Sequence, residues 1–382
     1  MKKILLLALA LVMVLSLTVS AVAETIINPD ELSYPVHTPA NKSDNPVIEG
    51  EHPFTGLKAE TDEERDALER FTPILVVYDN NAEGYMHWGV GSADIIFQVP
   101  NQSMANNKLL ALYASRFPVY AGGLRSARMT AFPFALALNT AFASAGMPPE
   151  GEPREDGTVG VNFYRKKYSY TNHQKYFDCT SGRNYHHKLS EEEQKQYGVK
   201  GVSASLAHIQ EMRNDWMLAN GVTFEKRPFL FTDEPLTRGE EATVIDMQFR
   251  ESTDPKNTKT NENSNCTFRY EEGLGYTRDI LAGTEFDRET EEFLYFANVI
   301  VMRVKTNSKG VWGTSYLYYE NNLVGSGKAD IFQNGRYIRG AWYREKEDSR
   351  LIFLDDEGNE LQFQRGASYI VVNDNHCVVT YE

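Results

Sequence analysis

The stretch PILVVY, residues 73–78, carries the clearest fold signal in the chain. It is short, apolar and rich in β-branched residues, and the turn residues 79–81 follow it, a pattern typical of a buried strand. The stretch ADIIFQV, residues 93–99, has the same character. The run LLALYASRF, residues 109–117, suits either a strand or a helix, and we favour a strand. Three such runs in close succession predict a group of buried strands.

Helix signals flank these strands. Thr61 can cap a short acidic helix that ends near Phe71. In residues 126–145 a cap at Ser126 precedes alanine, phenylalanine and leucine at helical spacing, which predicts a mostly buried helix. Proline removes a backbone donor and clashes one turn back, so a helix that begins at Pro133 is the alternative.

Strand signals dominate the second half of the chain. A polar stretch at 251–265 predicts a surface loop, and apolar runs with hairpin signals between them follow it. The length favours two domains. We therefore predict an α+β fold with an amino-terminal α/β domain over residues 61–250, including a helix-and-turn segment at 191–201 and a helix at 202–220, and a smaller β-rich carboxy-terminal domain over 251–382.

The first 23 residues have the pattern of a secretory signal. Two lysines precede an apolar run at 4–17, and the small residues Ala21 and Ala23 suit cleavage after Ala23. The run is shorter than the roughly 20 residues that span a bilayer. We therefore expect an extracellular or envelope protein with no membrane span after cleavage. Residues 24–60 are rich in proline, asparagine and acids and predict a flexible leader.

The charge and the cysteines exclude several classes of function. Cleavage would remove two lysines and no acids, which lowers the net charge from −14 to −16. Such a surface repels polyanions, so we expect no nucleic-acid partner. The cysteines Cys179, Cys266 and Cys377 allow one disulfide at most and require none. No Cys/His spacing indicates a metal site, and no motif indicates a cofactor.

The stretch AGGLRSAR, residues 121–128, is the best candidate for a binding site. Its two glycines free the backbone, and Arg125, Ser126 and Arg128 stand at the start of the helix predicted from residue 126. Backbone N–H groups, a helix dipole and two guanidinium groups suit a carboxylate or a phosphate. The alternative is that both arginines form structural ion pairs with acids of this acidic protein.

Three other patterns have ordinary explanations. The stretch GSGK at 325–328 lacks the glycine spacing, the hydroxyl and the following helix of a phosphate loop, so a tight hairpin turn is expected there. The acidic run 285–292 lacks the alternating oxygens of a calcium loop and is expected to be a solvated face. The adjacent histidines 186 and 187 point to opposite sides of an extended chain, which favours surface or hydrogen-bonding roles over metal binding.

Three segments together resemble the YerB family of exported Gram-positive proteins, many of them lipoproteins, whose function is uncharacterised. They are residues 45–57 with PFTGL at the end, residues 93–128 from ADIIF to RSAR, and residues 298–342 from NVIV through GSGK to GAW. The resemblance implies an amino-terminal α/β domain and a smaller β-rich domain. It also implies that Arg125, Arg128 and His187 share one cleft of the first domain.

The chain departs from the family pattern at several positions. Family members usually carry glutamates after the Ala-Asp strand and an arginine before the next strand, where this chain has Gln98, Gln102 and Lys108. The usual lipid-bearing cysteine is absent. The resemblance does not supply a reaction.

These observations lead to three hypotheses. The first is a non-catalytic envelope protein that binds an anionic ligand, a cell-wall fragment or a partner protein, through Arg125, Ser126 and Arg128, with His187 and Asp94 in the same site. The second is a cell-wall hydrolase that uses His187 and Asp94 as acid and base. The third is a structural adaptor, which would expose a large apolar patch. We expect no catalytic residues, because no nucleophile motif is present.

Overall fold

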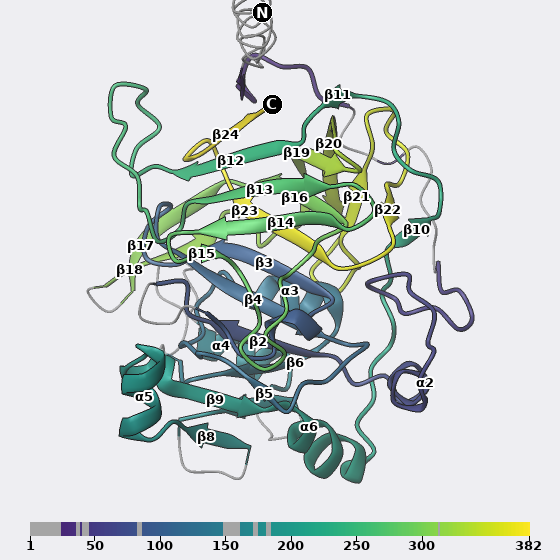
Figure 1. The fold of residues 1–382 in the computed structure, drawn as a ribbon, viewed down its shortest axis with the longest axis vertical. Helices are drawn as coiled ribbons and strands as arrows, with labels where there is room; N and C mark the ends of the chain where they lie inside the picture. Colours follow the sequence, from purple (N-terminus) through teal and green to yellow (C-terminus); the bar gives the residue numbers. More distant parts are fainter. Residues whose placement is uncertain are drawn as a thin grey trace, which may run out of the picture.

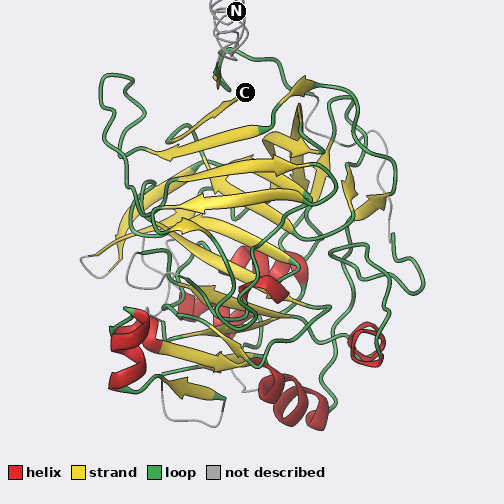
Figure 2. Ribbon diagram, in the orientation of Figure 1, coloured by secondary structure: helices red, strands yellow, loops and turns green. Residues whose placement is uncertain are grey.

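The computed structural model describes residues 24–35, 39, 46–81, 86–147, 161–170, 175–180, 185–311 and 314–382, with the side chains of 308–316 left out. The predicted signal peptide, residues 1–23, lies outside this description. The described chain is mostly β, with few and short helices (Figure 1; Figure 2). The β-rich character expected of the second half therefore extends into the first half as well.

One large sheet organises the molecule. Its strand order is β11 (Glu240–Glu241), β20 (Arg336–Arg344), β19 (Gly325–Gln333), β16 (Asn298–Arg303), β23 (Ser368–Asn373), β3 (Ile95–Pro100), β4 (Asn107–Tyr113), β2 (Ile74–Tyr78), β6 (Ala141–Ser144) and β7 (Tyr176–Asp178), and β21 (Ile352–Leu354) pairs with β20. The strands predicted around 73–78, 93–99 and 109–117 are confirmed as β2, β3 and β4. Strand β3 pairs in parallel with β23, so the two halves of the chain join in this sheet.

The large sheet has two distinct edges. Strands β16, β23, β3, β2, β6 and β7 share one direction, because β4 runs antiparallel to both β3 and β2 and the other neighbours are parallel. The hairpin of β17 (Thr306–Val311) and β18 (Thr314–Tyr319) follows β16 and marks the carboxyl edge, while β22 (Gln362–Gln364) precedes β23 at the amino edge (Figure 1). In sheets with parallel strands, ligands bind outside the carboxyl ends of the strands.

A second sheet crosses the predicted domain boundary. Its order is β1 (Thr25–Ile27), β24 (Cys377–Tyr381), β12 (Val244–Phe249), β13 (Cys266–Glu271), β14 (Gly275–Ile280) and β15 (Gly283–Thr284). The boundary expected after residue 250 falls between β12 and β13, which pair with Ile245 opposite Phe268. The segment after residue 250 is therefore bound by backbone hydrogen bonds to the strand before it.

The flexible leader predicted for residues 24–60 is wrong for the parts that the structure describes. Residues 25–27 form β1 and pair with β24. The Tyr34 hydroxyl donates to Asp330 Oδ1 at 2.5 Å, and Phe54 is fully buried. Composition suggested disorder here because the few apolar residues have no partners nearby in sequence; their partners come from the carboxy-terminal half.

The buried helix α3 (Phe132–Leu138) packs on one face of the large sheet, whereas the other helices and the small sheets surround that sheet. These other elements are α2 (Asp62–Glu69), α4 (Val161–Lys167), α5 (Glu191–Tyr197), α6 (Ile209–Glu211), the helical turns 201–204 and 212–220, the sheet of β5 (Tyr120–Ala121), β9 (Ser205–His208) and β8 (His186–Lys188), and the pair β10 (Leu230–Thr232) and β22. Helix α2 begins with the predicted cap. The Thr61 hydroxyl accepts a hydrogen bond from Glu64 N, and the Glu64 carboxylate accepts one from Thr61 N. The helix predicted at 202–220 is wrong at its start, where residues 205–208 form β9.

The long helix predicted at 126–145 is also wrong. Helix α3 begins only at Phe132, with Pro133 in its first turn, and it ends at Asn139 in a left-handed conformation. Residues 141–144 form β6, which pairs with β2. The alternative start near Pro133 is therefore confirmed, since proline is tolerated only in the first turn of a helix.

The large sheet is apolar on both faces. Ile74, Val76 and Tyr78 belong to one hydrophobic cluster, and the intervening Leu75 and Val77 belong to another. This explains why PILVVY reads as a continuous apolar run rather than an alternating one. Among the described residues, no helix is long and apolar enough to cross a membrane.

Candidate functional site

A group of positive side chains lies at the carboxyl edge of the large sheet. We call Lys108, Arg125 and Arg128, together with the acid Asp79, the cationic cluster. Lys108 begins β4 and lies opposite Val99 near the end of β3. Asp79 directly follows β2. The loop that carries both arginines connects β5 to α3.

The arginine loop is extended along the ends of two parallel strands. Arg125 N donates to Val77 O of the β2 strand at 3.0 Å, and Ala145 N, just after β6, donates to Arg125 O at 3.0 Å. A Cβ atom on Gly123 would lie 2.2 Å from the Ser203 carbonyl oxygen, so only glycine permits this approach. The arginines therefore do not stand at a helix start as predicted, because α3 begins four residues after Arg128.

Lys108 is the most constrained member of the cluster. Only 5% of its surface is exposed, and its Nζ donates to Ser126 O at 2.7 Å. Burial, and then the positive charges of Arg128 and Arg125, hold the pKa of the Lys108 ammonium well below its ordinary value, while Asp79 acts in the opposite direction. The ammonium group thus lies in a site that would be stabilised by a further negative charge.

Asp79 supplies negative charge to the cluster. Its carboxylate forms an ion pair with Arg125 Nε at 3.2 Å and accepts hydrogen bonds from Asn81 Nδ2 at 2.7 Å and Ser203 Oγ at 2.5 Å. The structural ion pair considered for Arg125 is therefore present. Arg128 donates to the Ala127 carbonyl at 2.8 Å. Among the described side chains that act on the charge of Lys108, Arg125 and Arg128 are basic and Asp79 is acidic.

Ser126 orders the loop through its backbone and its hydroxyl. Its Oγ donates to Ala145 O at 2.9 Å, and its carbonyl accepts from Lys108. The Ser126 side chain is only partly buried. It therefore joins Lys108 to the end of β6 and lies between the two arginines in sequence.

His187 is not brought to the cationic cluster by any contact that the structure describes. It lies in β8 of the small sheet, and its ring contacts Tyr120 with a centroid separation of 5.0 Å. Within the described part of the chain, His187 makes no hydrogen bond to a carboxylate or a hydroxyl. The acid and base pair of the hydrolase hypothesis is therefore not assembled with Asp94.

Asp94 lies near the opposite edge of the sheet. It precedes β3 by one residue, five residues before Val99, which corresponds to roughly 17 Å of extended strand. Its buried carboxylate accepts from Ala114 N at 2.8 Å, from Ser115 N at 2.9 Å and from the Ser115 hydroxyl. Its inclusion in the binding site is wrong, and its contacts hold the end of β4.

We expect Asp94→Asn to alter how stability depends on pH. Burial raises the pKa of Asp94 from 3.8 to about 6, so between these values the folded protein binds more protons than the unfolded chain. The free energy of unfolding of the parent protein therefore falls over this window. The variant cannot ionise at this position. Its free energy of unfolding, measured by urea denaturation, should therefore rise relative to that of the parent by about 2 to 3 kcal/mol between about pH 4 and pH 7. The exposed Asp348→Asn is the control, and a difference that is independent of pH would contradict the prediction.

The tight turn predicted for GSGK at 325–328 is wrong, because these residues lie within strand β19 and pair with β20. The acidic run 285–292 is a solvated face only in its second half, because Glu289, Glu291 and Glu292 are exposed but Glu285 and Asp287 are fully buried. Asp287 accepts from Gly89 N at 2.9 Å and from Gly91 N at 2.7 Å, so it fixes a loop of the first half. Among the described residues, no group of acids, histidines and cysteines could hold a metal ion.

Two members of the cluster were missed as site residues. Lys108 is predicted from the sequence only as the residue that replaces a family arginine. A basic residue kept at that position is the signal that could have identified Lys108 as a site residue. Asp79 was interpreted only as a turn residue. Neither side chain has a local sequence pattern that indicates proximity to Arg125, because the pairing of β4 with β2 and β3 creates it.

Comparison with known proteins places the chain in a family. Residues 54–197 match the N-terminal domain, and residues 257–370 the C-terminal domain, of a family described as "Protein of unknown function (DUF3048)". The crystal structure of YerB protein from Bacillus subtilis is similar at a TM-score of 0.65 and 18% identity, over 86% of this chain and 99% of that chain. No curated protein matches. At this identity the likeness concerns the fold, and together with the two domain matches it shows that the chain belongs to the YerB-like DUF3048 family.

Proposed function

We propose that this protein binds a ligand with a carboxylate or phosphate group at the cationic cluster. The observation that carries the proposal is the buried Lys108 ammonium, which lies beside Arg125 and Arg128 and against the Ser126 carbonyl. Burying a charge is costly unless an opposite charge compensates it. An anion between these groups would supply that compensation through charge-assisted hydrogen bonds.

The position of the cluster supports the same proposal. It lies where β2, β3 and β6 end, at the carboxyl edge of strands that run in one direction. Arg125 has 32% of its side chain exposed, so a ligand can reach it from solvent. We further propose, from the signal-peptide pattern, that the protein works outside the cytoplasm. Its ligand would then be an anionic component of the cell envelope.

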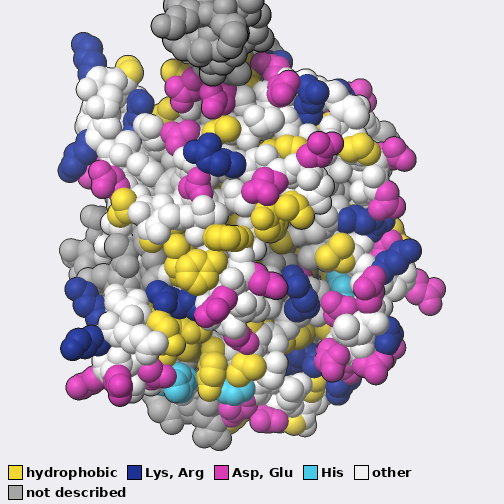
Figure 3. All heavy atoms as spheres, in the orientation of Figure 1, with side chains coloured by type: hydrophobic (Ala, Val, Ile, Leu, Met, Phe, Trp, Pro, Cys, Tyr) yellow, Lys and Arg dark blue, Asp and Glu magenta, His cyan; other side chains and the backbone are white. Residues whose placement is uncertain are grey.

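The other two hypotheses have weaker support. No contact between His187 and Asp94 occurs in the part of the chain that the structure describes, so nothing there supports the acid and base pair of the hydrolase hypothesis. An adaptor would need a continuous apolar surface. The most exposed large apolar side chains, Ile26, Leu274, Leu281 and Phe293, come from separate loops and strands, and on the face in Figure 3 apolar side chains alternate with charged ones.

The proposal is tested by replacing both arginines of the cluster. We expect Arg125→Ala/Arg128→Ala to weaken the binding of inorganic phosphate, or of N-acetyl-D-alanine as a carboxylate probe, by at least about tenfold, since two charge-assisted contacts are lost. The melting temperature should fall by no more than a few degrees. Isothermal titration with each probe distinguishes a phosphate from a carboxylate ligand.

The control is the double variant Arg65→Ala/Arg269→Ala, which removes the same charge from two exposed sites. It should bind both probes like the parent protein. If neither probe binds the parent protein, or if the cluster variant binds as the parent does, the proposed site is wrong.

A further inference from the structure

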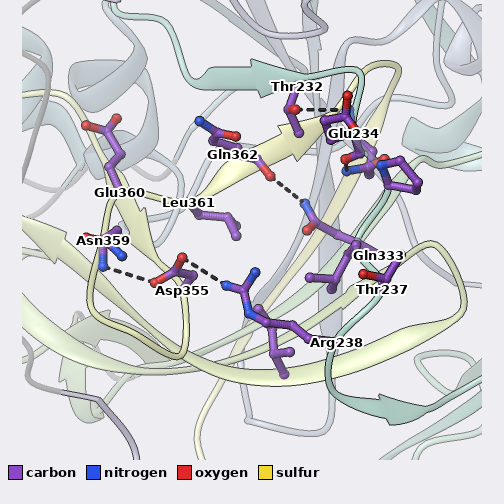
Figure 4. Close-up of a pocket in the computed structure, with 14 residues that line it drawn as sticks. Thr232, Glu234, Thr237, Arg238, Gln333, Asp355, Asn359, Glu360, Leu361 and Gln362 are labelled. Atoms are coloured by element: carbon purple, nitrogen blue, oxygen red, sulfur yellow. Dashed lines mark hydrogen bonds and ion pairs between the residues drawn. The ribbon is translucent and has the colours of Figure 1, made fainter.

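A concave site lies at the amino edge of the large sheet, opposite the edge that carries the cationic cluster. It is an open cavity of about 420 Å³ between the loop that joins β10 to β11, the end of β19 and the start of β22 (Figure 4). Small-molecule sites span about 300 to 1,000 Å³. The loop, residues 233–239, lies between the two segments that match the family domains, so neither match assigns a function to it.

The cavity has an apolar floor. Leu236, Ile338 and Leu361 line it and are 8%, 3% and 3% exposed. They belong to the loop, to β20 and to the residue just before β22. The face of a ligand that carries C–H groups could pack on these side chains and remove apolar surface from water.

Gln333 presents a hydrogen-bond acceptor above this floor. The residue is 1% exposed, and its Nε2 donates to Asn298 Oδ1 at 2.7 Å and to Gln362 O at 3.3 Å. No described residue donates to its Oε1. In Figure 4 the amide of Gln333 points into the cavity, toward the side from which Arg238 approaches. The Oε1 atom is not one of the buried side-chain atoms that lack a partner, so it is open to the cavity, where a ligand hydroxyl or N–H group could donate to it.

The charges of the lining are largely compensated within the protein. Arg238 donates through Nε to Asp356 at 2.9 Å and through Nη2 to Asp355 at 3.0 Å. Glu360 pairs with Arg350. This cavity therefore has no excess of positive charge to attract an anion. Its remaining polar groups include the hydroxyl of Thr237 and the amides of Gln333 and Gln362.

We infer that this cavity binds an uncharged saccharide of one or two rings. Each sugar hydroxyl donates one hydrogen bond and accepts others, which suits an acceptor at Gln333 opposite the guanidinium donors of Arg238. The C–H face of the ring suits the floor of Leu236, Ile338 and Leu361. This site is independent of the anion site, because the two lie at opposite edges of the sheet.

The experiment uses the full mature chain with N,N′-diacetylchitobiose and cellobiose as probes. Thr237 is exposed at the rim, so Thr237→Trp fills the cavity without removing a core contact. We expect saturation-transfer NMR to detect at least one disaccharide at millimolar concentration with the parent protein, and affinity at least tenfold weaker with Thr237→Trp. Thr258→Trp, at an exposed position in the loop 251–265, is the matched control and should bind normally.

Two outcomes would overturn the inference. One is the absence of saturation transfer from the parent protein to both disaccharides, and the other is undiminished binding by Thr237→Trp. A thermal melt of each variant shows that it is folded. The Arg125→Ala/Arg128→Ala variant should retain disaccharide binding, which separates a failure of this site from a failure of the anion site.

Discussion

Glu285→Gln is expected to lower the free energy of unfolding by about 3 to 5 kcal/mol. The Glu285 carboxylate is fully buried, and it accepts from Arg278 Nη1 at 2.6 Å and contacts His87 Nδ1 at 3.1 Å. Arg278 is equally buried and lies over the Tyr369 ring at 5.0 Å. The glutamine would leave the guanidinium without its countercharge. His87 also contacts Asp79 O at 2.7 Å, so the contacts of Glu285 form a junction between the two halves of the chain. Loss of the ion pair should therefore weaken this junction.

The effect of Glu285→Gln should depend on pH. The charge of Arg278, together with the His87 contact, holds the pKa of Glu285 at about 2, below its ordinary value of 4.5. The ion pair therefore stabilises the protein fully above about pH 4.5, and this contribution is lost as the pH falls toward 2. Urea denaturation at neutral pH and near pH 3 measures the difference between variant and parent, which should shrink in acid.

The control for Glu285→Gln comes from the same acidic run. Glu292 is exposed, and Glu292→Gln should change the free energy of unfolding by less than about 0.5 kcal/mol. A loss below about 1 kcal/mol in Glu285→Gln at neutral pH would mean that the buried pair does not hold the junction.

Lys108→Met is expected to stabilise the folded protein while it weakens anion binding. Methionine keeps most of the apolar stem of lysine but removes a buried ammonium that Arg125 and Arg128 repel. The Ser126 carbonyl loses one donor, which costs about 1 kcal/mol, but removal of the buried ammonium should outweigh this cost, so the melting temperature at neutral pH should rise. Phosphate or carboxylate affinity should fall by at least about tenfold.

The pH dependence gives this prediction a second readout. The folded-state pKa of Lys108 is depressed, so above that pKa and up to the ordinary value of 10.5 the unfolded chain binds more protons. The parent protein should therefore gain stability with rising pH in this window, and the advantage of Lys108→Met should shrink. Lys256→Met, at an exposed loop position, is the control. A destabilised variant that still binds the anion would show that Lys108 has a purely structural role.

The sequence alone determined the local elements. PILVVY at 73–78 predicted β2 because a strand covered on both faces has no polar alternation. Thr61 predicted the start of α2 because its hydroxyl and Glu64 satisfy the free N–H groups of the first turn. The arginine loop at 125–128 was identified from its charge and its glycines. These are signals that lie within a few residues of one another.

Only the tertiary structure decided how these elements combine. The parallel pairing of β3 with β23 joins residues about 270 positions apart, and no local pattern encodes it. The same pairing of distant strands buries Glu285 beside Arg278, brings Lys108 to the arginine loop and separates Asp94 from it. Backbone hydrogen bonds between strands are alike for most residue types, so a sequence shows that a strand exists but not which strand lies beside it.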